Sequence, residues 1–109
     1  MLKNLTKKST VSKNIEVADG FWQRTVGLIG KEGRTLTFHT RFGIHTFGMK
    51  SPMDVLILDD KMKVVSLKKN FKPNRIFLWN PRYKIVVETK NGAIDKSKTG
   101  LGDMLKIEL

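Results

Sequence analysis

The chain has 109 residues, of which 39% are hydrophobic and 28% charged, a balance typical of folded globular chains rather than disordered or membrane-embedded ones. It contains no cysteine, which excludes disulfide frameworks, thiolate nucleophiles and cysteine-bound metal clusters. Its net charge of +11 favours polyanionic partners such as nucleic acid, although a lysine-rich solvated surface explains the same charge equally well.

The length fits one hydrophobic core. We expect a basic segment over residues 1–13, contributing to a first strand, followed by a single β-rich domain over residues 14–109. The first residues lack the apolar stretch of a signal peptide, and no later stretch is long enough to span a membrane. These features predict a cytoplasmic location, and they carry no information on the oligomeric state.

The first half of the chain is predicted to hold one short helix between short strands. Asp19 is placed to accept hydrogen bonds from the free amides of a first helical turn, and Gly30 can end the helix in a left-handed conformation. The expected elements are a strand at 15–18, a helix at 20–28, and strands at 36–39 and 45–49.

The second half is predicted to be richer in strands. A polar turn at residues 59–61 indicates a hairpin, and Asn91-Gly92 marks another turn. The expected elements are strands at 53–58, 63–67, 76–79 and 84–89, a helical turn at 93–98 and a last strand at 104–109. This pattern predicts a mainly β (α+β) fold, a compact barrel or sandwich-like domain of mostly antiparallel strands with one or two short helices.

Residues 43–59, GIHTFGMKSPMDVLILD, gather polar and soft apolar side chains at the start of the most apolar run of the chain. Because side chains alternate along a strand, His45, Phe47 and Met49 are expected to share one face. On the next strand, Asp54 shares its face with buried leucines, so its carboxylate needs a partner.

Besides Arg24, whose guanidinium could reach this carboxylate or an anionic ligand, three partners for Asp54 are open. A tight connection between the strands would bring it to His45, as a structural pair or as an acid–base pair. Backbone amides of the Ser51-Pro52 turn are the second. The third is a metal shared with His45 and His39, but their spacing matches no known metal motif, so we predict no metal and no cofactor.

The leading hypothesis is a non-enzymatic binding module for a small ligand or peptide, with a cleft around this segment. The alternative is an acid–base enzyme that uses His45 and Asp54. The candidate ligand-binding residues are Arg24, His45, Phe47, Met49, Lys50 and Asp54.

A second constellation lies between residues 68 and 84, where basic and aromatic residues alternate. Exposed aromatics could stack on bases while the cations contact phosphates, as in single-strand binders. Equally, Phe71, Phe77 and Trp79 could be core residues of an ordinary half-exposed strand. The candidate nucleic-acid contacts are Lys68, Lys69, Lys72, Arg75, Arg82 and Lys84.

Residues 14–109 resemble the prokaryotic family called domain of unknown function 192. The segments that carry the resemblance are RTVGLIGK, GIHTFGMKSPMDVLILDDKMKVV, FKPNR and TGLGDMLKIEL. The family's motif positions fall here on Arg24, Gly27, Leu28, His45, Thr46, Phe47, Met49, Pro52, Asp54, Gly102 and Asp103. The resemblance implies a compact β-rich fold with small helices and no established activity.

Overall fold

The computed structural model describes residues 1–17, 35–41 and 43–108, and these residues are rich in short strands. The predicted mainly β fold is confirmed, and its sheets do not close into a barrel, so it is sandwich-like. The described elements are β1 (Leu2–Asn4), β2 (Ser9–Ser12), β3 (Ile15–Val17), β4 (Thr35–His39), β5 (Ile44–His45), β6 (Met53–Leu58), β7 (Val64–Phe71), β8 (Ile76–Phe77), β9 (Ile85–Lys90), α2 (Ala93–Ser97) and β10 (Leu105–Ile107).

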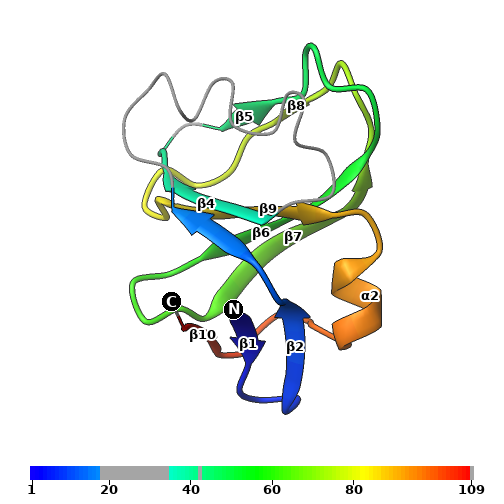
Figure 1. Ribbon diagram of the computed structural model, residues 1–109. Helices are drawn as coiled ribbons and strands as arrows, with labels where there is room; N and C mark the ends of the chain where they lie inside the picture. The colour runs from blue at the N-terminus through cyan, green and yellow to red at the C-terminus, as the bar shows by residue number, and fades with distance from the viewer. Residues whose placement is uncertain (18–34, 42, 109) are drawn as a thin grey trace.

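The strands form three stacked layers (Figure 1). A central sheet with strand order β3-β4-β9-β6-β7 is antiparallel except for the β3–β4 pair. Above it in Figure 1 lies the two-stranded β5–β8 ribbon, and below it lie α2 and a sheet of order β10-β1-β2. The central sheet is therefore covered on both faces.

Strand β6 is buried along its whole length because it contributes to a core on each side of the central sheet. A continuous apolar run is typical of a strand covered on both faces. The upper core, toward the ribbon, consists of Leu36, Phe38, Ile44, Met53, Val55, Ile57, Phe71, Phe77 and Val86. The lower core, toward α2, consists of Leu2, Val11, Leu56, Leu58, Val64, Val87, Ala93, Ile94 and Leu105.

Most predicted strands lie where they were expected, and the 59–61 turn does join β6 to β7. The strand predicted at 45–49 is wrong beyond His45. The chain turns there, since the Met49 amide donates to the Thr46 carbonyl at 3.1 Å and Gly48 takes a left-handed φ of 89°. The helix predicted at 20–28, with its capping residues, lies outside the described residues.

The lower sheet is fastened through Asp103. Its carboxylate accepts hydrogen bonds from the Lys7 ammonium at 2.8 Å, from Asn4 at 2.9 Å and from the Gly100 amide at 2.9 Å. Burial opposes ionisation of Asp103, but these three donors outweigh it and hold the pKa below its usual value. The network ties β1 and the turn after it to the loop before β10.

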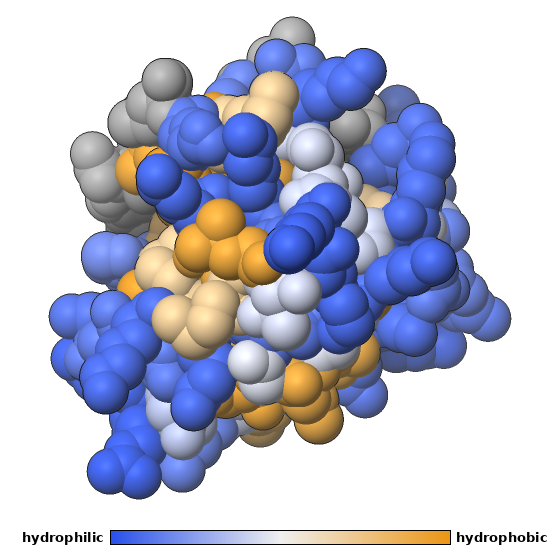
Figure 2. Space-filling view, turned by 90° about the horizontal axis from the view of Figure 1, so that it is seen from below, coloured by the Kyte–Doolittle hydropathy of each residue, from blue (hydrophilic) through white to orange (hydrophobic). Residues whose placement is uncertain are grey.

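The surface seen from below is mostly hydrophilic around an apolar area (Figure 2). Leu5 and Leu101 are the strongly exposed apolar residues of the segments beside β1 and β10. Within the described ranges, no helix is long and apolar enough to span a membrane.

Candidate functional site

Asp54 lies at the start of β6 with its side chain toward the lower core, on the face predicted from its alternation with the leucines. Only 1% of the residue is exposed. One carboxylate oxygen accepts the Asn70 amide at 3.0 Å, and the other accepts the Gly92 and Ile94 amides at 3.1 and 2.9 Å. Backbone amides are thus its partners, but they come from β7 and the start of α2 rather than from the 51–52 turn.

His45 lies on the opposite side of the central sheet from Asp54. Its strand β5 pairs with β8 and covers the β6 face that carries Met53 and Val55. The pairing of His45 with Asp54 was expected from a tight connection between neighbouring strands. The structure does not bring them together, because β6 pairs with β7 and β9 instead of β5.

His45 and Phe47 instead form a pair of stacked rings. Their centroids are 5.1 Å apart with an interplanar angle of 26°, and the His45 Nδ1 accepts the Phe47 amide at 3.3 Å. Both residues are exposed. The sequence placed these rings on one face of a strand, whereas the structure stacks them at a turn.

Thr46, between these rings, is buried and joins the two constellations that the sequence kept apart. Its hydroxyl donates to the Lys72 carbonyl at 2.7 Å and accepts the Arg75 amide at 2.9 Å. Its own amide donates to the Arg75 carbonyl at 3.0 Å, and its carbonyl accepts the Asn74 amide at 3.2 Å. The backbones of Lys72 and Arg75, both exposed residues, are therefore bonded to the residue between the two rings.

Replacing Thr46 with valine is expected to lower the free energy of unfolding by about 1–3 kcal/mol, because the part-buried Lys72 carbonyl and Arg75 amide each lose the hydroxyl as a partner. Thermal unfolding of Thr46→Val and Thr46→Ser measures this. The serine variant keeps the hydroxyl and should recover most of the loss. Equal melting temperatures for the valine variant and the parent protein would contradict a structural role for the hydroxyl.

The outward side of the ribbon is apolar. Ile76, opposite His45 in the β5–β8 register, is 61% exposed, Leu78 is 69% exposed and Phe47 is 49% exposed. Leu78 lies across Gly43, where an added Cβ would be only 2.6 Å from the leucine side chain. We call the exposed side chains of His45, Phe47, Ile76 and Leu78 the ribbon face.

The aromatic residues of the second constellation belong to the core. Phe71 and Phe77 are buried in the upper core, and Trp79 packs against it with its indole N–H donating to the Tyr83 carbonyl at 2.7 Å. The reading in which Phe71, Phe77 and Trp79 stack on bases is therefore wrong. The physical reason is that their hydrophobic area is used to cover the central sheet.

The cations of that constellation divide into two groups. Lys68 lies 5.5 Å from the centroid of the buried Phe77 ring, and Lys69 pairs with Asp95 at 2.6 Å. Lys72, Arg75 and Arg82 are exposed, and Lys84 is half-buried. The first group serves packing and surface pairing. In the second group, Lys72 and Arg75 are the cations whose backbones bond to Thr46, between the two rings of the ribbon face.

The remaining predicted residues are spread out. Arg24 lies outside the described residues, Met49 is half-buried against the upper core, and Lys50 is exposed. In the part of the chain that the structure describes, no three His, Asp or Glu side chains are grouped as metal ligands.

Glu88 is the buried acid that the sequence reasoning missed. It lies on β9 between Leu36 and Val55 in the sheet register, so its side chain shares the face of the upper core and only 6% of the residue is exposed. Burial raises its pKa to about 8. The sequence did contain a signal for this burial. Glu88 lies two residues after Val86 on a predicted strand, so the two side chains share a face, the one that the apolar Val86 turns inward.

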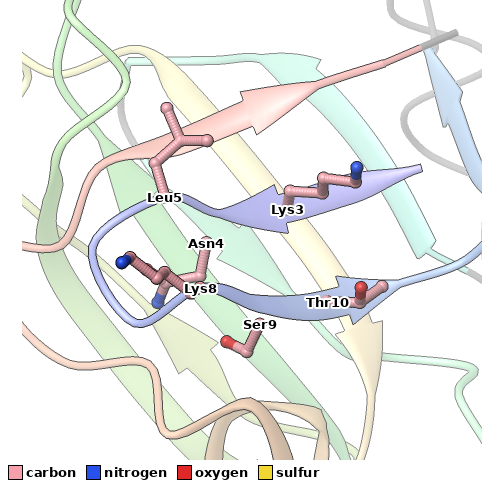
Figure 3. A pocket seen from close by; sticks show the side chains of 6 residues that line it. All are labelled: Lys3, Asn4, Leu5, Lys8, Ser9 and Thr10. Atoms are coloured by element: carbon pink, nitrogen blue, oxygen red, sulfur yellow. The ribbon is translucent and has the colours of Figure 1, made fainter.

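A shallow pocket lies on the β1–β2 hairpin, and several of its lining side chains bond to other parts of the fold (Figure 3). Lys3 pairs with Glu108 at 3.0 Å, Asn4 donates to Thr99 and Asp103, and Ser9 donates to the Ser97 carbonyl. Lys3 and Lys8 point in opposite directions along the hairpin (Figure 3). These cations do not converge on one ligand.

Together, the fold and the ribbon face define a small three-layered β protein whose described residues include an exposed apolar ribbon face. The chain belongs to the domain of unknown function 192 family, since the family model, described as "Uncharacterized ACR", matches residues 3–107. The family expected from the motifs is thereby confirmed.

Relatives and solved structures agree with this assignment. UPF0127 proteins of Pyrococcus horikoshii and Thermococcus sibiricus are 31% and 32% identical, with 97% and 100% of this chain aligned to 97% and 75% of theirs. A protein of unknown function from Novosphingobium aromaticivorans has a TM-score of 0.75 at 14% identity, covering 85% of this chain and 74% of its own. A putative transcription regulator from Sinorhizobium meliloti has a TM-score of 0.70 at 19% identity, covering 84% and 79%. At these identities, the two structures show the fold alone.

Proposed function

We propose that this protein is a non-enzymatic binding module that holds an anionic partner on the ribbon face. The observation that carries the proposal is the Thr46 network, which bonds the backbones of Lys72 and Arg75 to the residue between the stacked rings of His45 and Phe47. This network supports a joint role for His45, Phe47, Lys72 and Arg75, four of the residues expected from the two sequence segments.

The chemistry of this surface favours a partner with negative charge and flat apolar groups. Large apolar side chains gathered on one outer surface, rather than scattered, mark interaction sites. The net charge of +11 attracts polyanions at long range, and the exposed cations add a local contact. A small anionic ligand or an acidic peptide would use the same cations. A cytoplasmic location stays a prediction.

Binding is favoured over acid–base catalysis by the state of Asp54. Both of its oxygens accept backbone amides, so the carboxylate is occupied by the fold. Among the described residues, the His45 Nδ1 accepts its hydrogen bond from the Phe47 amide and not from a carboxylic acid. An enzyme based on these two residues would need a rearranged sheet.

Retention on a heparin column tests the proposal with charge-matched variants. The double variant Lys72→Gln/Arg75→Gln is expected to elute at clearly lower salt than Lys61→Gln/Lys106→Gln, whose lysines are exposed on the β6–β7 turn and on β10. Both variants lose two positive charges, so the difference reports position rather than net charge. Equal elution of the two variants would contradict the proposed surface.

A further inference from the structure

We infer that the anionic partner is single-stranded nucleic acid, with a base stacked on the Phe47 ring and neighbouring phosphates on Lys72 and Arg75. This inference rests on the proposed function and narrows its partner to one chemical class. It differs from the stacking expected from the sequence, because the rings involved are those of the 45–47 turn and not those of the core.

The rings of His45 and Phe47 are stacked and exposed before any partner binds. Phe47 is 49% exposed while it stacks on His45 at an interplanar angle of 26°, so part of an ordered aromatic residue stays open to solvent. The hydrogen bond between the Phe47 amide and the His45 Nδ1 fixes the pair locally, and the buried Thr46 fixes it to the 72–75 turn. A surface ordered before binding loses less conformational entropy when a base arrives.

Two exposed cations, Lys72 and Arg75, lie in the turn that bonds to Thr46. Lys72 and Arg75 flank the same Thr46 hydroxyl, so both side chains start within one hydrogen bond of the residue between the rings. Within the described residues, the Arg75 guanidinium donates a long hydrogen bond of 3.5 Å to the carbonyl of its neighbour Asn74. The guanidinium therefore keeps donors for a phosphate, the group that its planar fork suits best.

An exposed aromatic ring favours a single-stranded nucleic acid over other anionic partners. Stacking on a ring needs an unpaired base, which a duplex keeps inside its own helix. An acidic peptide would use the cations but not the flat face of Phe47. Exposed Ile76 and Leu78 extend the apolar surface beside His45, where a second base or a sugar could lie.

Fluorescence anisotropy with labelled oligouridylate and oligothymidylate of about eight nucleotides, within the usual site size of single-strand binders, tests the inference. Phe47→Ala is expected to weaken binding about tenfold or more, and Phe47→Leu should not restore it because the ring is lost. Lys72→Gln/Arg75→Gln should reduce the slope of log K against log salt by about 1.4, for two lost phosphate contacts. Leu101→Ala, a strongly exposed leucine between α2 and β10, is the control and should bind as the parent protein does.

The outcomes distinguish the two proposals. If polyglutamate or a duplex of equal length binds as tightly as the single strand, or if Phe47→Leu binds like the parent, single-stranded nucleic acid is the wrong partner while an anion-binding ribbon face stands. If no anionic probe responds to the Lys72 and Arg75 changes, the proposed function itself fails. Tight single-strand binding that depends on the Phe47 ring would support both.

Discussion

Replacing Glu88 with glutamine is expected to stabilise the protein above neutral pH and to remove a large loss of stability between pH 5 and pH 8. The native pKa of about 8 lies above the ordinary value of 4.5, so the folded state keeps a proton that the unfolded state releases in this window. Stability therefore falls as pH rises, because the unfolded state binds fewer protons. Glutamine has the shape of the protonated acid but cannot ionise.

The expected size of this effect follows from the pKa difference. Each pKa unit corresponds to about 1.4 kcal/mol, so the full shift sets an upper limit of about 5 kcal/mol, reached only above pH 8. Urea unfolding at pH 5, 6.5 and 8, followed by tryptophan fluorescence, measures the slope in both proteins. Asp103, whose pKa is lowered, loses its contribution in acid and does not interfere with this window.

The difference between the Glu88→Gln variant and the parent protein is the decisive quantity, because the other titrating groups are common to both. The two free energies of unfolding should be similar near pH 5 and should separate steadily toward pH 8. Parallel curves over this range would show that Glu88 ionises normally in the folded protein, against its burial between Leu36 and Val55.

Replacing Asp54 with alanine should cost about 3 kcal/mol or more, which is at least the upper end of what one unsatisfied buried group costs. Three backbone amides, of Asn70, Gly92 and Ile94, lose the same acceptor at once. Two of these amides lie where α2 begins, and the short helix has no side-chain cap of its own. Thermal unfolding and amide hydrogen exchange at the three donors measure the loss.

Asp59→Ala is the matched control for this variant. Asp59 also accepts two backbone amides, those of Lys61 and Lys63 at 2.9 Å, but these lie in the exposed turn between β6 and β7. Water can replace the lost acceptor there, so a change of about 1 kcal/mol or less is expected. If Asp54→Ala melts like the parent protein, the carboxylate does not stabilise the fold through these three amides and is free for another role.

Local patterns predicted much of the fold. The apolar run of β6 at residues 55–58, the polar turn after it and the apolar start of β7 define a hairpin without any distant contact. Asn91-Gly92 likewise marks the turn before α2, where Gly92 takes a φ of 95°. The strand expected at 45–49 failed because the alternation of His45, Phe47 and Met49 also fits a turn in which Thr46 is the buried residue.

From its motifs and the two-residue period of a strand, the sequence alone predicted the family, the β-rich class and the face of β6 on which Asp54 lies. Asp54 was correctly placed beside Leu56 and Leu58 on that basis. Only the packed structure showed which strands far apart in the chain became neighbours. It put His45 and Asp54 on opposite sides of one sheet, buried Glu88 between two apolar neighbours, and brought residues 45–47 to residues 72–75, since pairing between segments far apart in the chain depends on how the whole core packs.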